Sequence, residues 1–186
     1  MLFAKDILDK PEGNKKLQPG IHEGVTVTGV EVGDRWLDFN YANSDGDYNN
    51  KRIWFPELDK IRVDEGQSIA DALKEADEVA FGHMVTHMRI FLSPDELNTF
   101  SAPDLKTAAI KCAALLTPRL KEQKINLKIT FDKDGVWTRI PDKKYIEKNV
   151  EGQPTTLAFT DWELKNRMTK KQTPTSLPED DGPLLY

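Results

Sequence analysis

The sequence predicts a mainly β domain with a helical insertion, and two changes of hydrophobic period carry that prediction. Between residues 20 and 57, apolar and polar residues alternate in three successive segments, which is typical of strands with one buried face. The period becomes helical over about residues 66–117, and alternation returns at residues 124–132. Such strands, the first of them long and bent, favour a small closed barrel over a flat sheet. We expect five or six strands, with the helical insert between the third and the fourth.

The first strand is expected to bend at a glycine. Val25 and Val27 alternate with polar residues, and the pattern resumes one step out of phase at Val30, with Gly29 at the slip. A slip of this kind indicates a β-bulge, which turns the inward face of the strand. The next two strands alternate regularly, and their inward residues are predicted to be Leu37, Phe39 and Tyr41, then Ile53 and Phe55.

The helical insert begins and divides at residues that commonly cap helices. Ser68 is followed three positions later by Asp71, which resembles a capping box. A second helix is predicted to begin with Ser93 as its N-cap and Pro94 in its first turn, and a third to begin after Asp104.

The later strands are predicted from the same alternation. In residues 124–132 the apolar positions face inward, which points Lys128 toward solvent. An Asp-Gly turn at residues 134–135 leads into a strand over 136–140. A last short strand is expected at residues 155–160.

The chain is therefore divided into three parts. Residues 1–19 contain several proline and glycine breaks and are predicted to form a loosely held N-terminal arm. Residues 20–162 form the barrel domain. Residues 163–186 lose periodicity and are predicted to be a disordered, flexible acidic tail.

Composition places the chain among intracellular proteins without a membrane span. No run of about 18 apolar residues is present, and the single cysteine, Cys112, fits a reducing compartment. We expect a cytoplasmic location, which for a viral protein is the host cytoplasm. The net charge is −5, but residues 57–104 carry −7 whereas residues 119–148 carry +4. Binding responds to the local field, so the basic half remains compatible with an anionic partner.

Large aromatic and cationic side chains alternate with the inward residues of the second and third strands. Trp36 and Trp54 are predicted to face water, and the cations Arg35, Lys51 and Arg52 are predicted to lie on the same side. One interpretation is that another part of the chain covers these rings, since exposed aromatics are costly. The other is a platform on which unpaired bases stack while cations follow the phosphates.

Other constellations do not indicate a metal or a reaction. His83 and His87 are four residues apart on a predicted helix, but no further ligand pattern accompanies them, so we expect packing or surface roles. Asp45 and Asp47 imitate the start of a calcium loop, although the closing glutamate position is occupied by Pro56, which favours a plain turn. We find no nucleophile elbow, phosphate loop or paired acid and base, and expect no enzyme activity and no cofactor.

The layout and the C-terminus together resemble a known family. The strand order with its helical insert matches an OB-fold barrel, whose second and third strands commonly bind oligonucleotides. Over about residues 20–160 the chain is similar to the single-stranded DNA-binding proteins of tailed bacteriophages, with a bent glycine-containing first strand and outward aromatics on the next two. The last nine residues, PEDDGPLLY, resemble the acidic, apolar-ended tips of bacterial and phage single-strand binding proteins.

These features predict sequence-tolerant binding of single-stranded DNA in replication, recombination or repair. The candidate binding residues are Arg35, Trp36, Tyr48, Lys51, Arg52, Trp54, Lys128, Trp137 and Arg139. The tail is predicted to recruit a polymerase, helicase or primase through Glu179, Asp180, Asp181, Leu184, Leu185 and Tyr186. Two alternatives stay open: a viral interaction or assembly module that binds no nucleic acid, and an RNA-binding OB-fold protein. The oligomeric state is also open, and a homo-oligomer is compatible with the sequence.

Overall fold

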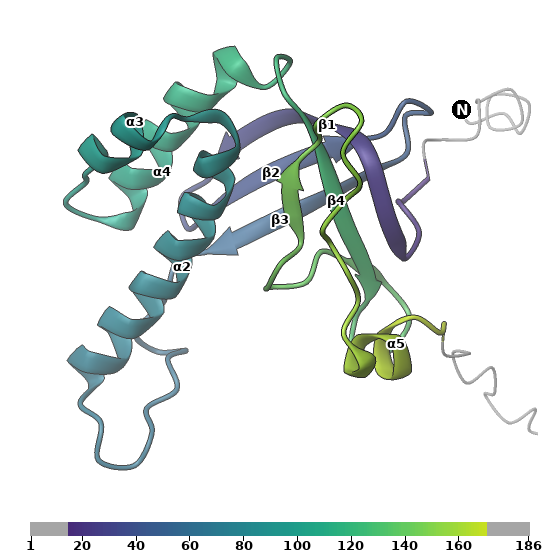
Figure 1. The fold of residues 1–186 in the computed structure, drawn as a ribbon. Helices are drawn as coiled ribbons and strands as arrows, with labels where there is room; N and C mark the ends of the chain where they lie inside the picture. Colours follow the sequence, from purple (N-terminus) through teal and green to yellow (C-terminus); the bar gives the residue numbers. More distant parts are fainter. Residues whose placement is uncertain (1–14, 171–186) are drawn as a thin grey trace, which may run out of the picture.

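A six-stranded antiparallel sheet forms the body of the protein (Figure 1). The structure is a computed structural model, and it describes residues 15–170. The strands are β1 (Gly20–Val32), β2 (Trp36–Ala42), β3 (Tyr48–Trp54), β4 (Lys124–Phe131), β5 (Thr138–Arg139) and β6 (Ile146–Lys148). Their order is β3-β2-β1-β4-β5, and β6 pairs with β4 on its own. The prediction of a mainly β domain of five or six strands with a helical insertion between the third and fourth is confirmed, whereas the strand order is that of an open sheet, with no ladder that joins β3 to β5.

The long strand β1 bends as its sequence predicts. Its register against β2 shifts between Val27 and Gly29, where the hydrophobic alternation slips. A second irregularity lies between His22 and Val25 in the pairing with β4, and Gly24 there has a φ of 70°. A positive φ is accessible to glycine at little cost. These two bends let β1 pair with β2 through its C-terminal half and with β4 through its N-terminal half.

The two ends of the sheet, β3 and β5, approach each other through side chains. The Nδ2 atom of Asn49 on β3 donates to the Oγ1 atom of Thr138 on β5 at 3.4 Å. The Nζ atom of Lys51 donates to the carbonyl of Ile140, just after β5, also at 3.4 Å. The sheet is therefore curved like a barrel, with polar side-chain contacts between the strands at its two ends.

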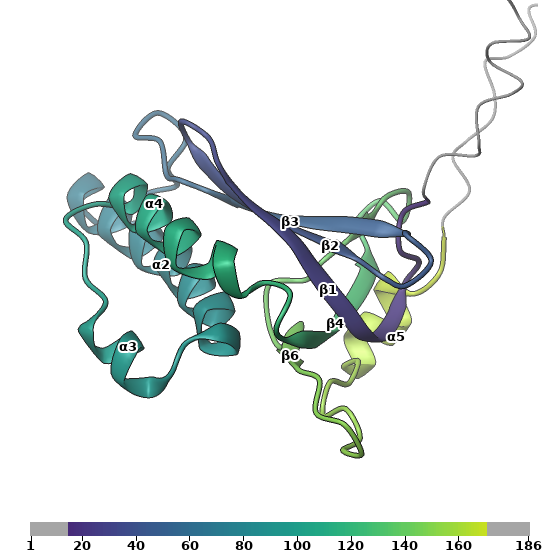
Figure 2. The same ribbon diagram turned by 90° about the horizontal axis from the view of Figure 1, so that it is seen from above.

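The helical insert occupies one side of the sheet, as the second view shows (Figure 2). Its helices are α2 (Ile69–Phe91), α3 (Pro94–Thr99) and α4 (Leu105–Leu116), followed by a short 3-10 turn, η1 (Thr117–Arg119). The Ser68 side chain caps α2 by accepting from the backbone N–H of Asp71, and Ser93 forms a complete capping box with Glu96. Ser68 and Ser93 are thus the N-caps that the sequence predicts, although the capping box is complete only at Ser93.

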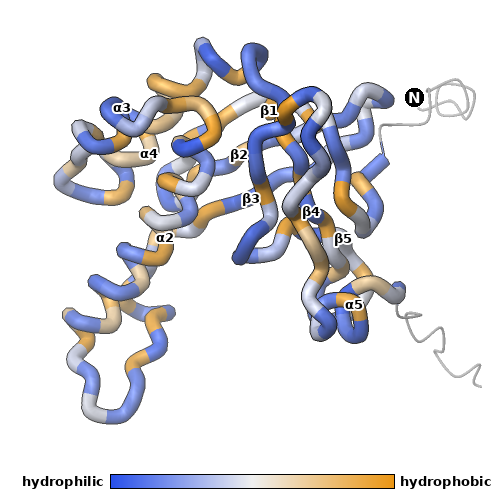
Figure 3. Tube along the Cα trace, viewed as in Figure 1, coloured by the Kyte–Doolittle hydropathy of each residue, from blue (hydrophilic) through white to orange (hydrophobic). Residues whose placement is uncertain are grey.

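The core lies between the inner face of the sheet and the packed faces of α2 and α4. Phe39 and Tyr41 on β2 are buried, as are Met84 and Met88 on α2 and Cys112 on α4. Hydrophobic and hydrophilic residues alternate along the tube of α2, as expected of a helix with one packed face (Figure 3). Leu37 and Ile53 are also buried, so the strand phase that the sequence predicts for β2 and β3 is correct.

The outer face of β4 is covered, which the sequence pattern did not indicate. Residues 155–160 form an irregular segment and not the predicted strand, while the additional pairing strand β6 occurs earlier in the chain. The helix α5 (Asp161–Arg167) follows, with Thr160 as its capping residue. The flexible tail predicted from residue 163 thus begins with helical residues, and residues 171–186 lie outside the described residues.

The end of the N-terminal arm is attached to the sheet. The backbone N–H of Leu17 donates to the carbonyl of Tyr48 at 2.9 Å, and the N–H of Tyr48 donates to the carbonyl of Lys15 at 2.9 Å. The Leu17 side chain is buried in the core. Residues 15–19 of the predicted loose arm are therefore anchored beside β3, and residues 1–14 lie outside the described residues.

Candidate functional site

Two tryptophans and an arginine form a cluster on the outer face of β2 and β3. Trp36 pairs with Trp54 in the register of the two strands, and Asp38 pairs with Arg52. The guanidinium carbon of Arg52 lies 4.2 Å from the ring centre of Trp36 and 5.1 Å from that of Trp54. Trp54 keeps 59% of its surface exposed. The cluster therefore presents aromatic surface to solvent around a planar cation.

A buried carboxylate holds the arginine in place. The Nε and Nη2 atoms of Arg52 donate to the two carboxylate oxygens of Asp38, at 2.8 and 2.6 Å. These hydrogen bonds raise the pKa of Arg52 above its usual value. The bidentate geometry fixes the plane of the guanidinium, which in turn orients the two rings that it contacts.

The turn between β1 and β2 brings a glycine against the Trp36 ring. A Cβ atom added at Gly33 would lie 2.2 Å from the Cε2 atom of Trp36, so only glycine fits this ring position. The backbone N–H of Gly33 also donates to the carbonyl of Trp36 at 2.9 Å. The indole is therefore fixed between Gly33 on one side and Arg52 on another.

Tyr48 extends the same face toward the opposite end of β3. It pairs with Ala42 and lies six positions before Trp54, and this even offset places both on one face of the strand. The rise of a strand puts them roughly 20 Å apart. The Nζ atom of Lys16 lies 4.3 Å from the centre of the Tyr48 ring. A line of ring surfaces thus crosses the outer face of β2 and β3.

The predicted cations differ widely in their surroundings. Arg35 is exposed and forms an ion pair with Glu57 at 2.7 Å, and Arg139 pairs with Asp142 at 2.8 Å. Together with the Asp38 pairing of Arg52, each predicted arginine has a carboxylate partner. The open face therefore offers more aromatic surface than uncompensated positive charge.

The two predicted lysines do not face water, and that part of the prediction is wrong. Lys51 is 7% exposed, and its Nζ atom donates to Asp142 at 2.6 Å and to the carbonyl of Pro141 at 3.1 Å. It lies two residues from buried Ile53, so the strand period itself places it inward. Lys128 is 2% exposed, because the segment after β6 covers it; its Nζ atom pairs with Glu163 at 3.0 Å.

Trp137 lies apart from the cluster. It sits in the turn before β5 and not within the predicted strand, and 73% of its surface is exposed. Its carbonyl accepts from the backbone N–H of Asp132 at 2.8 Å, which fixes the turn. Trp36, Arg52 and Trp54 are thus brought together, whereas Trp137 is a separate exposed ring.

Sequence reasoning missed another group of aromatic and basic residues, which lies on α5 and on the loop beside it. This group is Lys143, Lys144, Trp162 and Arg167. Trp162 is 58% exposed, and the guanidinium carbon of Arg167 lies 5.1 Å from its ring centre. The signal that could have found it is the presence of Trp162 and of several basic residues at the boundary between the predicted domain and the predicted tail.

The two histidines of α2 are accounted for by packing. His87 is buried and stacks on Phe39 with ring centres 3.7 Å apart. Its Nε2 atom is hydrogen-bonded to the Tyr41 hydroxyl at 2.5 Å, and its Nδ1 atom to the carbonyl of His83 at 2.8 Å. Burial lowers the pKa of His87 to about 3. Within residues 15–170, no group of three or more potential metal ligands is assembled.

The acidic turn between β2 and β3 is held by its own side chains. The Oδ1 atom of Asn43 accepts from the backbone N–H groups of Asp45 and Asp47, and Gly46 has a φ of 83°. This is the geometry of an Asx turn, in agreement with the sequence interpretation.

Comparisons with known proteins found no match: neither family models, nor curated proteins, nor solved structures resemble the chain significantly. In the described part of the chain, no helix combines the length and the apolar character needed to cross a membrane.

Proposed function

We propose that the protein binds single-stranded nucleic acid, with single-stranded DNA as the principal ligand, on the outer face of β2 and β3. The observation that carries this proposal is the Trp36–Arg52–Trp54 cluster, in which the Trp54 ring and the Arg52 guanidinium are exposed and the Trp36 ring is half-buried beside them. Bases stack on aromatic and guanidinium surfaces irrespective of sequence, each contributing roughly 1–3 kcal/mol. Two engaged rings would therefore give useful affinity without any reading of base edges.

The strand connections support the further proposal of an OB-type barrel. β1 pairs with both β2 and β4, β4 pairs with β5, and the helices are inserted between β3 and β4. The side-chain contacts of Asn49 with Thr138 and of Lys51 with Ile140 bring β3 beside β5. Strands 2 and 3 of that fold commonly carry the oligonucleotide-binding face, which here is the face with the cluster. On the same grounds we propose that the protein is related to the single-stranded DNA-binding proteins of tailed bacteriophages.

The test is a titration followed by tryptophan fluorescence. Oligo-dT, oligo-U and duplex DNA are added at several salt concentrations. We expect strong quenching by oligo-dT, a weak response to duplex, and affinity that falls as salt rises. Tighter binding of oligo-U than of oligo-dT would make RNA the ligand. Absence of quenching by either strand at low salt would contradict the proposal and favour the interaction module.

The recruitment of replication proteins rests on the sequence of the C-terminal tip alone. The residues concerned, from Glu179 to Tyr186, lie outside the described residues. An acidic segment with an apolar end fits a peptide that fills a pocket while its carboxylates meet basic residues. We expect deletion of residues 177–186 to abolish binding to the purified polymerase, helicase or primase of the host while single-strand affinity is retained. Equal binding of the truncated protein would contradict this role.

A further inference from the structure

A basic and aromatic hollow, separate from the cluster, lies between the end of β4, the loop after β5 and α5. Its volume is about 550 Å³. Phe131, Pro141 and Trp162 supply its apolar walls. The charged residues that line it are Lys128, Arg139, Lys143, Lys144, Arg167, Asp142 and Glu163. The hollow thus combines ring surface with an excess of positive charge.

Ion pairing leaves three of these cations uncompensated. Glu163 pairs with Lys128, and Asp142 pairs with Arg139, so both carboxylates of the hollow are occupied. Within residues 15–170, Lys143, Lys144 and Arg167 form no ion pair. This differs from the face of β2 and β3, where Arg35 and Arg52 are neutralised by carboxylates. The hollow therefore holds positive charge that no carboxylate among residues 15–170 offsets.

Arg167 has a donor with no acceptor among the described residues. Its Nη1 atom is buried and makes no hydrogen bond there, although the residue lines the hollow. An unsatisfied buried donor is unfavourable, and phosphate oxygens are acceptors that guanidinium groups bind well. The guanidinium also contacts the Trp162 ring, so a phosphate bound here would lie close to an exposed aromatic surface.

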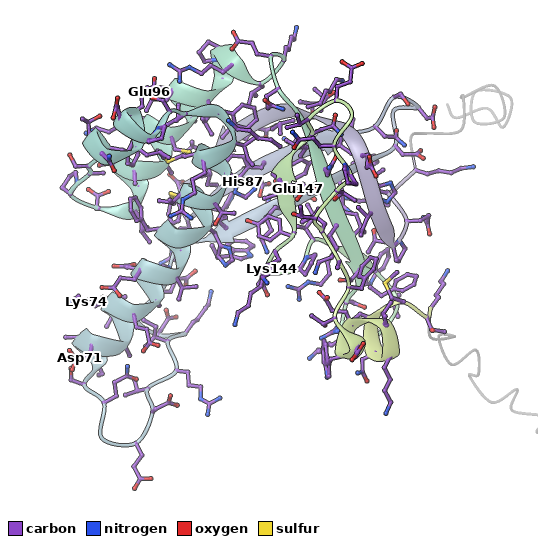
Figure 4. All side chains as sticks on the ribbon, in the orientation of Figure 1. Asp71, Lys74, His87, Glu96, Lys144 and Glu147 are labelled. Atoms are coloured by element: carbon purple, nitrogen blue, oxygen red, sulfur yellow. The ribbon has the colours of Figure 1, made fainter. Side chains whose placement is uncertain are left out.

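The backbone at Lys144 supports the same interpretation. Lys144 has a φ of 45°, the only positive φ of a non-glycine residue among residues 15–170. Residues held in this region are strained, and such strain is concentrated at sites that clamp a ligand. Lys144 is labelled between α2 and α5 (Figure 4). The loop therefore holds an uncompensated ammonium group at a conformational cost.

The hollow is adjacent to the cluster. A smaller hollow of about 280 Å³ lies beside Trp54 and Arg52, and Asp142 lines both hollows. The two carboxylate oxygens of Asp142 are bound by Lys51 at 2.6 Å and by Arg139 at 2.8 Å. Its negative charge is thus compensated, and it does not bar an anionic chain from passing between the two hollows.

We propose that this hollow is a second contact for the strand that stacks on the cluster: the strand passes Asp142, its phosphates bind Lys143, Lys144 and Arg167, and a base stacks on Trp162. The proposal rests on the proposed function and deepens it by assigning the phosphate contacts that the cluster lacks. The shared chemistry is a phosphate ester beside a nucleobase, which a free nucleotide also offers.

The test compares two double variants of equal charge change. Lys143→Ala with Lys144→Ala removes two cations of the hollow, and Lys74→Ala with Lys121→Ala removes two exposed cations elsewhere. Oligo-dT of increasing length is titrated at several salt concentrations. Each lost phosphate contact lowers the salt slope by about 0.7, so the first variant should lose about 1.4 and bind long strands roughly 20-fold more weakly at about 0.1 M salt. The control variant should match the wild type.

Two single variants separate binding from folding. Trp162→Ala should weaken long-strand binding about five-fold or more, because a stacking surface is lost. Lys144→Gly removes the ammonium group but relieves the positive φ, so its thermal midpoint should stay level or rise while the salt slope falls by about 0.7. A lower affinity in this variant therefore reports the contact and not damage to the fold.

The outcomes distinguish this inference from the proposed function. If the wild type binds no single strand, the proposed function and this inference both fail. If the wild type binds and Trp54→Ala weakens it, but the lysine double variant equals its control, only the hollow is contradicted. If thymidine monophosphate binds the wild type and not the lysine variant, yet the two have the same oligo-dT slope, the hollow is a nucleotide site and the strand path is wrong.

Discussion

The outer faces of β2–β3 and of β4 carry similar residues and have opposite environments. On β2 and β3, Arg52 lies against the rings of Trp36 and Trp54, and Trp54 stays 59% exposed. On β4, Lys128 occupies the equivalent alternating position, but it is 2% exposed and bound to Glu163 of α5. Alternation decides which side of a sheet a residue occupies. Whether that side meets water is decided by the rest of the chain.

The cations on the two faces, Lys128 and Arg52, also have different roles. A buried cation must be paired, so Lys128 contributes to attaching α5 and has no free charge for a ligand. Arg52 is also paired, but the Trp54 ring that it contacts stays 59% exposed, so a surface on which a base can stack is still available. The covered face is therefore expected to determine stability and the open face to determine binding.

The largest expected effect comes from removing the ion pair that attaches α5 to the outer face of β4. Lys128→Ala removes the Nζ atom that donates to the Ala158 carbonyl at 3.1 Å and to Glu163 at 3.0 Å. Because the carboxylate is left largely buried without its cation, the free energy of unfolding should fall by about 3–5 kcal/mol. Urea denaturation measures this loss.

Its control removes both charges together. Lys128→Met combined with Glu163→Leu leaves no unpaired charge, although the Ala158 carbonyl and the Thr160 N–H lose their partners, so it should recover part of the lost stability. A loss below about 1 kcal/mol in Lys128→Ala would mean that α5 does not cover β4 in solution, and the contrast between the faces would disappear.

The next effect concerns the open face. Trp54→Ala should reduce the binding of oligo-dT by about 1–3 kcal/mol, since a stacking surface is lost. The free energy of unfolding should change by less than about 1 kcal/mol, because Trp54 is mostly exposed. Fluorescence titration and thermal unfolding of the same sample measure both, with Trp54→Phe as a variant that keeps a ring. A collapsed thermal midpoint with unchanged affinity would show that Trp54 is a core residue.

A third prediction concerns the dependence of stability on pH, which comes from the histidines of α2. Burial lowers the pKa of His87 to about 3, against about 6.5 for an unfolded chain. The unfolded state therefore binds more protons between these values, and stability falls as pH drops below about 6.5. Between pH 7 and 5 the loss from His87 should be about 2 kcal/mol, and His83, whose pKa burial also lowers, adds to it.

The variant His87→Gln identifies the source of that loss. It should flatten the dependence of the unfolding free energy on pH to the part that His83 supplies. Strands β2 and β3 contain no histidine, but His83 lines the smaller hollow beside Trp54 and Arg52, so any change of single-strand affinity over this range should persist in His87→Gln. An unchanged pH dependence in the variant would contradict the assignment to His87.

The elements predicted well are those whose signal is local. The slip at Gly29, the caps at Ser68 and Ser93 and the phase of β2 are all written in neighbouring residues. The burial of Lys51 was also predictable, because it shares the parity of Ile53. Wherever the two-residue period was followed along a whole strand, it gave the correct face for each side chain.

What could not be predicted depends on contacts between distant segments. Lys128 is covered by residues some 30 positions later in the chain, and nothing near it in the sequence indicates that cover. Residues 155–160 look like a strand by propensity, yet Glu147 binds the hydroxyl groups of Thr155 and Thr156 and holds this segment against β6 without a ladder. The hollow beside α5 is also formed by residues far apart in the sequence, from Lys128 to Arg167, so no local pattern indicates it.

The smallest effect concerns the glycine that positions Trp36. In Gly33→Ala the new Cβ would lie 2.2 Å from the indole, so the ring must move away from the place where Arg52 contacts it. Gly33 does not have a positive φ, so the backbone itself accepts alanine, and the change in stability comes from moving the half-buried indole. The displaced stack should lower oligo-dT affinity about five-fold, or about 1 kcal/mol. Gly29→Ala is the matched control, because its nearest neighbour would be Asn40 at 3.6 Å, an ordinary contact. Equal affinities of the two variants would show that the orientation of Trp36 does not matter, and that Trp54 alone makes the open face a binding surface.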